Sequence, residues 1–500
     1  MQSRYLYEGW ILLVRIIMWG WFRFVHIVGG ENVPRRRPLI LLSTHSNMIV
    51  DPVVLTYSIP YHRPCHFWAK NGLFRNKFTR RVLTTVGALP VDRTTKDNAL
   101  LFQATFDVLH QGGVITSFPE GTSYTLPHIM RLKDGSSWAA LEYAKHLEDS
   151  AVFRNAALTP LERERMQLQI VPTGITYIDK YHWRGGCIVQ FGKPIDVHDH
   201  LPQFRTDRRT AVKRLTQDIT TAFRQLTINA PDWDSLHRGQ VARDILFAES
   251  ELKPAHYVRV TQNLVDFFLP SSPDQEVDPS IKYLGSRILN YYDLLRQLRV
   301  SDHHILFFTR RIEGAHTPWP ATLAPLFLRL ARFLIEIPFS FPAVVIHMPV
   351  YFLATLAGHV ENDAESVAQT KIGTTLLVLL PAYTTLFYYI WQRAFAGSLP
   401  GFFAALVFIP IYALYHIMYI DHRYDSIKAL WATIRMLLAV AGYHHRIDIS
   451  QITAAVALRQ DIHQELQTMV EKHSQDLGGH AKADSLTPSL AFVRQALVAY

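Results

Sequence analysis

The sequence predicts an α/β domain with a mixed β-sheet flanked by helices, preceded by an interfacial helix and followed by a helical membrane region. Three observations predict this class. Short apolar runs alternate with amphipathic stretches between residues 38 and 230, which is typical of strands alternating with helices. An apolar, aromatic segment lies before them, at residues 7–30. Two apolar segments without Asp, Glu, Lys or Arg, 372–392 and 401–420, follow them and are long enough to cross a bilayer of about 30 Å.

The amino-acid composition indicates which kinds of molecule the protein could bind. Charged residues make up only 19% of the 500 residues, below the usual value of about 25%, which indicates membrane contact. The net charge of +9 favours anionic partners, namely nucleic acid, anionic lipid or phosphorylated substrates. No nucleic-acid-binding module is visible, and the two candidate spans argue against one. Two cysteines exclude a disulfide framework and a cysteine-rich zinc site, and favour a reducing compartment.

The first 30 residues are predicted to form a helix that lies in the membrane interface. Trp10, Trp19 and Trp21 are the amphipathic rings that such a helix uses for docking. Arg15 and Arg23 argue against a membrane span. The segment has no small-residue cleavage site, so a secretory signal peptide is not expected. An ordinary core helix is the alternative.

Residues 31–230 are predicted to form the catalytic domain, because a turn cluster at 229–235 marks its end. The strands are predicted at 39–43, 65–69, 114–118, 169–177 and 187–191, and the helices at 97–111, 136–149 and 210–229. Beyond this domain we expect a helical extension over 231–320, a membrane-embedded region over 321–425 with a transmembrane hairpin, and a helical tail over 426–500. The prolines within 338–357 favour a re-entrant or interfacial segment there.

The turn after the first predicted strand carries a candidate acid/base pair. His45 follows that strand, and Asp51 comes six residues later. On one continuous helix the two would diverge by about 240°. The pair therefore requires His45 on the turn and Asp51 within the following helix. A histidine acting as a base needs such a partner to hold it in one tautomer.

Four further segments supply candidate site residues. "FPEGTS" contributes Glu120, Gly121, Thr122 and Ser123, which are typical of an anion or substrate site. "GALPVDR" and "LKDG" contribute cations, Arg93 and Lys133, and "IVPTGITY" contributes Pro172 and Gly174. The guanidinium of Arg93 suits bidentate binding of phosphate. An ordinary glycine turn and solvated surface cations are the alternatives.

Taken in order, "STHSNMIVDP", "GALPVDR", "FPEGTS" with "LKDG", and "IVPTGITY" resemble the four motifs of the glycerolipid acyltransferase family. The usual family spacing is H-x4-D, whereas this chain has H-x5-D. The longer form resembles the fungal-type branch that acylates glycerol-3-phosphate or dihydroxyacetone phosphate. "LTINAPDWDSL" and a membrane region after the catalytic domain also resemble that branch.

The resemblance implies a reaction and a role for each residue. An acyl group would pass from acyl-CoA, as co-substrate, to a glycerol-phosphate hydroxyl, with His45 as base and Asp51 as its support. Arg93 would bind the acceptor phosphate, with Lys133 as a second cation. The remaining pocket residues would be Glu120, Gly121 and Thr122. Backbone N–H groups of the 121–123 turn, including Ser123, or near Pro172 and Gly174 would stabilise the oxyanion, and the sequence leaves both open. No metal or other cofactor is required.

The same motifs also serve a lysophospholipid acyltransferase, which is the alternative function. The spacing and the C-terminal half favour the smaller acceptor. We expect an integral membrane protein whose catalytic domain lies on the cytosolic face. The membrane would be the endoplasmic reticulum in a eukaryote and the inner membrane in a bacterium.

Overall fold

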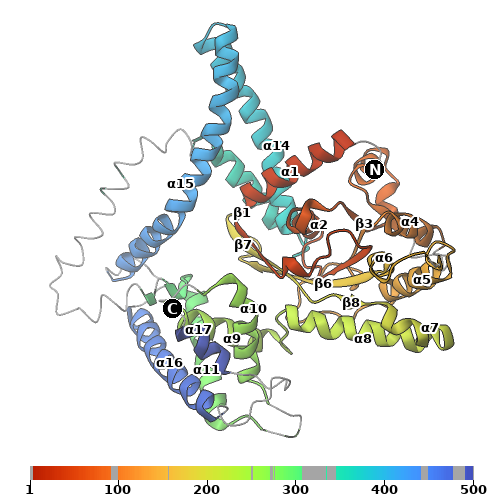
Figure 1. The fold of residues 1–500 in the computed structure, drawn as a ribbon. Coiled ribbons are helices and arrows are strands. Elements are labelled where there is room, and N and C mark those ends of the chain that lie inside the picture. Colours follow the sequence, from red (N-terminus) through yellow and green to blue (C-terminus); the bar gives the residue numbers. More distant parts are fainter. Residues whose placement is uncertain are drawn as a thin grey trace. The chain divides into compact units, whose positions relative to one another are not determined.

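The chain divides into two compact units. In the computed structural model, the first unit comprises Met1–Ile228 with Gly358–Ile372, and the second comprises the rest of the chain. The first boundary lies close to the turn cluster that marks the predicted domain end. The structure describes residues 4–91, 99–155, 157–248, 252–270, 274, 276–303, 305–306, 331, 334, 345–440, 449–476 and 490–498 (Figure 1).

The first unit is built on a mixed sheet, which confirms the predicted fold class. Within the described residues the sheet has eight strands, with β8 beside β6 and the others in the order β1-β7-β6-β2-β5-β3-β4. Pairing is parallel except where β6 meets β7 and β8. The strands are β1 (Phe22–Val28), β2 (Leu39–Ser43), β3 (Cys65–Lys70), β4 (Leu89–Val91), β5 (Val114–Ser117), β6 (Gln169–Ile178), β7 (Gly185–Phe191) and β8 (Ile195–Asp196).

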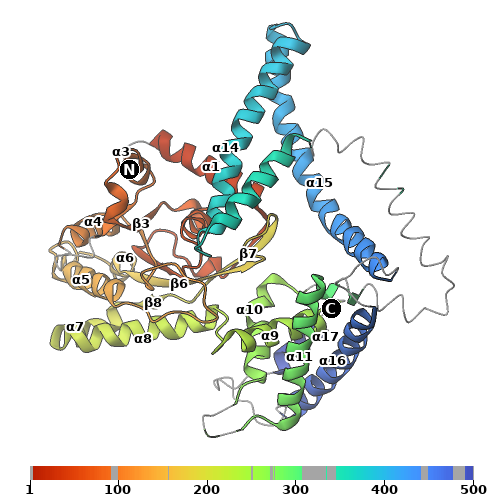
Figure 2. The ribbon, with the colours of Figure 1, turned by 180° about the vertical axis from the view of Figure 1, so that it is seen from behind.

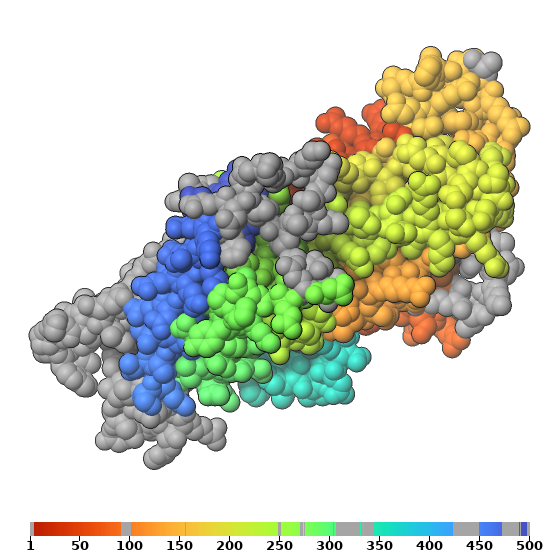
Figure 3. Space-filling model, turned by 90° about the horizontal axis from the view of Figure 1, so that it is seen from below, coloured from red at the N-terminus to blue at the C-terminus, as the bar shows by residue number. Residues whose placement is uncertain are grey.

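Helices cover both faces of this sheet, so its central strand is apolar on both sides. In β2 every residue is buried. Leu39 and Leu41 join a core with α1 (Arg4–Trp21) and α2 (Val50–Ser58). Ile40 and Leu42 join a second core with α5 (Gly135–Asp149), α7 (Leu201–Thr206) and α8 (Arg208–Leu226). Figure 1 shows the two helical layers, and Figure 3 shows α7 and α8 along one face of this unit.

The remaining short helices of the first unit connect the strands. They are η1 (Gly30–Asn32), η2 (Pro60–His62), η3 (Asn71–Phe74), α3 (Lys77–Thr85), α4 (Ala99–His110), α6 (Pro160–Met166) and η4 (His198–His200).

The N-terminal segment differs from the predicted helix over residues 1–30. Helix α1 ends at Trp21, and residues 22–28 form β1, which pairs with β7. Trp21 is 2% exposed and packs edge-on against Trp183, so it belongs to the core. Trp19 is 44% exposed and shares the outer face of α1 with other exposed apolar side chains, namely Tyr5, Leu6, Leu12, Leu13 and Ile16. An apolar outer face therefore remains, but without Trp21.

The second unit contains a helical core that joins the predicted extension to the predicted tail. Its helices are α9 (Trp233–Leu246), α10 (Pro254–Phe267), α11 (Pro279–Leu298), α16 (Ile449–Asp476) and α17 (Leu490–Val498). Within it, Arg459 binds both carboxylate oxygens of Asp302, at 2.8 and 3.0 Å. Tyr291 donates to the same carboxylate at 2.7 Å. Figure 2 shows α16 beside α11.

The second unit also contains most of the predicted membrane hairpin. Helix α14 (Val367–Tyr388) continues into a π-helical turn, η5 (Tyr389–Ala394), and α15 (Leu399–Val440) follows. Two stretches, Val367–Ala394 and Leu399–Arg423, are long and apolar enough to cross a membrane. The segment predicted as re-entrant contributes a shorter apolar helix, Val345–Val360, and its residues 338–344 lie outside the described part.

Candidate active site

His45 and Asp51 lie at the carboxyl end of β2, in the arrangement that their pairing requires. His45 is on the turn, and Asp51 is in the first turn of α2. The His45 Nδ1 and Asp51 Oδ2 atoms are 2.9 Å apart. The Asp51 side chain is fully buried, whereas 12% of the His45 side chain is exposed. The imidazole of His45 is therefore partly accessible to solvent, whereas its carboxylate partner is not.

The surroundings of Asp51 fix its orientation. Its Oδ2 atom accepts hydrogen bonds from the backbone N–H groups of Ser46 and Asn47, both at 2.8 Å. Its Oδ1 atom accepts from the hydroxyl of Tyr177 in β6. Burial, and then the charge of Asp51, raise the pKa of Tyr177, so its hydroxyl stays protonated as a donor. With Nδ1–H donated to Asp51, the lone pair of His45 Nε2 is available as a base.

The "FPEGTS" segment lies beside His45, because β5 is the parallel neighbour of β2. The ring of Phe118 stacks on the imidazole, with the ring centroids 3.9 Å apart. The Oε1 atom of Glu120 accepts from the backbone N–H of His45 at 3.1 Å. The His45 carbonyl accepts from the N–H of Tyr124 at 3.1 Å. The structure thus brings together two motifs that are 75 residues apart.

The side chain of Glu120 is buried, and only one of its two carboxyl oxygens is hydrogen-bonded within the described residues. The residue is 1% exposed, and its Oε2 atom has no hydrogen-bond partner among the described residues. Burial raises the pKa of Glu120 to about 9, and the charge of Asp51 adds to this. The carboxyl is therefore protonated at neutral pH. In that state Oε2 carries either a free donor or a free acceptor for a substrate hydroxyl.

Gly121 allows the turn after Glu120 to fold and allows Lys133 to cross it. Its φ of +80° is in the left-handed region, and an added Cβ would lie 2.3 Å from Lys133 Nζ. The N–H of Gly121 is already bonded to the carbonyl of Phe118. The N–H groups of Thr122 and Ser123 have no partner within the described part of the chain. These two are therefore available as oxyanion donors.

Pro172 and Gly174 of β6 pack closely against neighbouring segments. A Cβ on Gly174 would lie 2.3 Å from the carbonyl oxygen of Leu226, at the end of α8. Pro172 packs against Gly192, whose added Cβ would lie 3.0 Å from the proline ring. The predicted place of Pro172 and Gly174 near the oxyanion stays a prediction. Strand β6 also contributes Tyr177 to the site, which the sequence analysis did not single out.

The cations of the site were predicted only in part. Arg93 lies outside the described residues, and the motif before it contributes β4. Lys180, which the sequence analysis missed, donates to Thr125 Oγ1 at 2.9 Å. Burial lowers the pKa of Lys180, whereas the charges of Asp51 and Glu365 raise it. A lysine three residues beyond a predicted strand is a weak signal in the sequence, because most such lysines are solvated.

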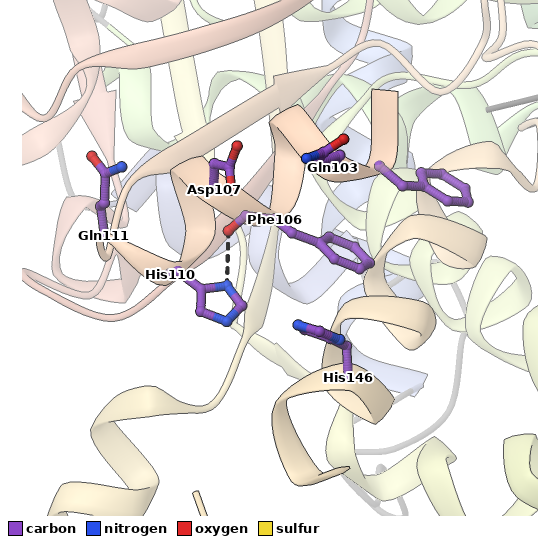
Figure 4. A pocket seen from close by; sticks show the side chains of 7 residues that line it. Gln103, Phe106, Asp107, His110, Gln111 and His146 are labelled. Atoms are coloured by element: carbon purple, nitrogen blue, oxygen red, sulfur yellow. Dashed lines mark hydrogen bonds between the residues drawn. The ribbon is translucent and has the colours of Figure 1, made fainter. Parts of the chain in front are cut away.

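The first unit contains other groups that could carry chemistry, among them Cys187, which is the partner of Tyr177 across strands β6 and β7. Cys65 and Cys187 are buried thiols whose pKa values are raised by burial, that of Cys65 to about 12. Among the described residues no group of three His, Cys, Asp or Glu side chains is placed to hold a metal ion. A cavity of about 550 Å³ lies between α4 and α5 (Figure 4). Its residue His110 precedes β5, at the opposite end of that strand from "FPEGTS".

Two family models match this chain. Residues 24–176 match the acyltransferase family model, and residues 241–475 match the model of the glycerol-3-phosphate acyltransferase 2 C-terminal domain. Glycerol-3-phosphate O-acyltransferase 2 of Saccharomyces cerevisiae is 27% identical over 286 residues, covering 56% of this chain and 35% of the relative. Glycerol-3-phosphate O-acyltransferase 1 of the same yeast is 23% identical over 314 residues, covering 59% of this chain and 37% of the relative.

A solved structure is also similar. The 1-acyl-sn-glycerophosphate acyltransferase of Thermotoga maritima has 16% identity and a TM-score of 0.29, covering 44% of this chain and 84% of that one. The chain spans only about a third of the length of the two yeast relatives.

The first match lies within the first unit, and the second begins in the second unit. The chain therefore carries an acyltransferase domain followed by a glycerol-3-phosphate acyltransferase 2 C-terminal domain, and it is similar to the two yeast glycerol-3-phosphate O-acyltransferases.

Proposed function

We propose that this chain transfers a fatty acyl group from acyl-CoA to the hydroxyl of glycerol-3-phosphate or dihydroxyacetone phosphate, the first step of phospholipid synthesis. The observation that carries the proposal is the His45–Asp51 pair. The His45 Nδ1 atom is bonded to Asp51, whereas its Nε2 atom has no hydrogen-bond partner among the described residues. Beside it lies Glu120, whose Oε2 atom likewise has none among them. This arrangement suits proton removal from an alcohol.

In the proposed reaction His45 Nε2 takes the hydroxyl proton as the substrate oxygen attacks the thioester carbonyl. Asp51 stabilises the imidazolium that forms. The tetrahedral intermediate then collapses, the carbon–sulfur bond breaks, and the coenzyme A thiolate takes the proton from His45. An ester and a free thiol result. The available N–H groups of Thr122 and Ser123 are the proposed donors to the oxyanion.

The acceptor is proposed to bind between the "FPEGTS" turn and the nearby cations. Arg93 and Lys133 are the proposed phosphate ligands, and Lys180 is a further candidate because it lies within electrostatic reach of Asp51. Glu120, Gly121 and Thr122 would form the wall of the same pocket. Two or three cations are well matched to a phosphate dianion.

Membrane attachment is proposed through the hairpin of α14 and α15, with the outer face of α1 lying in the interface. Leu377 and Leu380 on α14 are 77% and 73% exposed, which suits a lipid environment. A long acyl chain gains about 0.8 kcal/mol per CH2 in an apolar phase, so substrate and product partition into the bilayer. We place the catalytic unit on the cytosolic side, where acyl-CoA is made.

The test is acyl transfer from labelled acyl-CoA by membranes containing the protein, with three acceptors in parallel. These are glycerol-3-phosphate, dihydroxyacetone phosphate and lysophosphatidate, each repeated with His45→Ala. Activity on a small acceptor that His45→Ala abolishes supports the proposal. Activity on lysophosphatidate alone supports the alternative, a lysophospholipid acyltransferase. The H-x5-D spacing and the C-terminal domain favour the small acceptor.

A further inference from the structure

Most of the hydrogen-bond acceptors that hold the turn carrying His45 come from distant parts of the chain. Each backbone N–H group from Thr44 to Ile49 has a partner, and Asp51 supplies only two of them. The other partners are the Thr173 carbonyl, Glu120 Oε1, the Glu365 carbonyl and Gln369 Oε1. The last two come from a segment more than 300 residues further along the sequence.

We call this segment, residues 361–372, the strap. The carbonyl of Glu365 accepts from the N–H of Met48 at 3.2 Å. The side chain of Gln369 accepts from the N–H of Ile49 at 3.0 Å. The strap therefore bonds to the two residues of the turn that lie between the donors to Asp51 and the start of α2.

The strap is itself firmly seated in the first unit. Ala368 is 0% exposed and joins the core formed by β2 and α2. Lys371 Nζ donates to the carbonyl of Tyr181 at 2.8 Å, on the turn that also carries Lys180. Thr370 Oγ1 donates to Glu361 Oε2 at 2.7 Å, which ties the two ends of the strap together. Gln369 is thus presented to the turn from a fixed backbone.

The turn has little packing of its own at this point. The side chains of Met48 and Ile49 are 46% and 54% exposed, so the protein core does not hold them. Both residues belong to the longer H-x5-D spacing, and Ile49 is the N-cap of α2 without a side-chain cap. A turn that is one residue longer than usual can adopt more backbone conformations, including ones that place the histidine wrongly. An external acceptor for its N–H groups restricts that freedom.

We propose that Gln369 is a positioning residue, which fixes the His45–Asp51 turn through the N–H of Ile49. The proposal rests on the proposed function for its effect on rate, but not for its effect on the turn. Because α14 begins within the strap, the same helix that enters the candidate membrane span also holds the base in place. The C-terminal region would thus act on catalysis as well as on anchoring.

The test uses the full chain in lipid nanodiscs with three variants. Gln369→Met removes the acceptor at nearly constant size, Gln369→Glu keeps it, and Asn362→Leu is a matched control at an exposed position of the strap. We expect Gln369→Met to lower kcat about tenfold while the KM values of both substrates stay within about twofold. Gln369→Glu restores kcat, and Asn362→Leu leaves it unchanged.

Hydrogen exchange supplies a second readout that does not depend on activity. In Gln369→Met, the amides of Met48 and Ile49 are expected to exchange faster, with no change in the peptide of β5. Unchanged kcat and unchanged exchange would overturn the inference, as would an equal loss of kcat in Asn362→Leu. If the wild-type chain acylates none of the three acceptors and the exchange still rises, the proposed function fails while the role of Gln369 in the turn stands.

Discussion

At the scale of single residues, the pairing of His45 with Asp51 favours the tautomer that carries its proton on Nδ1. Asp51→Asn would replace an acceptor at Oδ2 by a group that can also donate, and the Nδ1–H tautomer would lose its support. We expect a loss of kcat of about 10⁴-fold, as for an equivalent change in other histidine–aspartate pairs. The measurement is acyl transfer by membranes that contain equal amounts of folded protein.

Tyr177→Phe is the companion variant for this prediction. It removes one donor to Asp51 and leaves the two backbone donors in place. We expect kcat to fall about tenfold, which is a much smaller loss than that in Asp51→Asn. Equal losses in the two variants would contradict the assignment of Asp51 as the direct partner.

The burial of Glu120 makes stability depend on pH. Its pKa in the folded chain, about 9, lies above its ordinary value of 4.5, so the folded chain binds one more proton between these pH values. This contribution to stability is fully present below pH 4.5 and is lost as pH rises toward 9. Glu120→Gln, which is neutral throughout, should therefore unfold at a higher temperature than the wild type, by a margin that grows with pH.

The melting temperatures of both proteins, measured at about pH 5 and about pH 8, check this prediction. Glu31→Gln, at an exposed glutamate, is the control and should show no pH-dependent gain. A Glu120→Gln gain that is the same at both pH values would mean that the carboxyl is not protonated in the folded chain.

At the scale of secondary-structure elements, the packing of α8 on β6 depends on Gly174. An added methyl group would meet the backbone of Leu226 at 2.3 Å, and a backbone carbonyl cannot move aside as a side chain can. We expect Gly174→Ala to cost about 1–3 kcal/mol of unfolding free energy, measured by denaturant titration. Gly135→Ala, where an added Cβ meets nothing within 4 Å, should be neutral or slightly stabilising.

Helix α1 offers a test of membrane docking at the same scale. Trp19 is 44% exposed on the apolar outer face, whereas Trp21 is 2% exposed. In vesicles with brominated acyl chains, Trp19→Phe is expected to remove part of the quenched tryptophan fluorescence, and Trp21→Phe is expected to remove almost none. Equal changes in the two variants would argue against an interfacial position of this face.

The elements predicted from the sequence are those with a strong local signal. Strand β2 was predicted with its observed bounds, and β3, β5, β6 and β7 within about two residues, because each is a dense apolar run between turn residues. Strand β1 was missed because its apolar residues continue those of α1 without a turn signal. Strands β4 and β8, with three and two residues, are too short to carry a period.

At the scale of the whole molecule, the sequence indicated the boundary near residue 230. It did not indicate that the first unit is discontinuous, being built from residues 1–228 and 358–372. The motif residues His45, Asp51 and Glu120 could be predicted because their types are unusual at strand ends. Tyr177, Lys180 and Gln369 could not, since each has an ordinary local sequence. Their roles arise from contacts that span 126 residues for Tyr177 and 320 for Gln369. No pattern within a short window contains such information.

The discontinuity of the first unit has a consequence for biosynthesis. The ribosome completes residues 1–228 well before it reaches 358–372, and the hairpin follows directly after those residues. Until then the N–H groups of Met48 and Ile49 lack their acceptors. The nascent catalytic unit therefore acquires its final segment only as the hydrophobic hairpin begins to emerge. Maturation of the enzyme and its arrival at the bilayer would then coincide in time, and unanchored chains would stay immature.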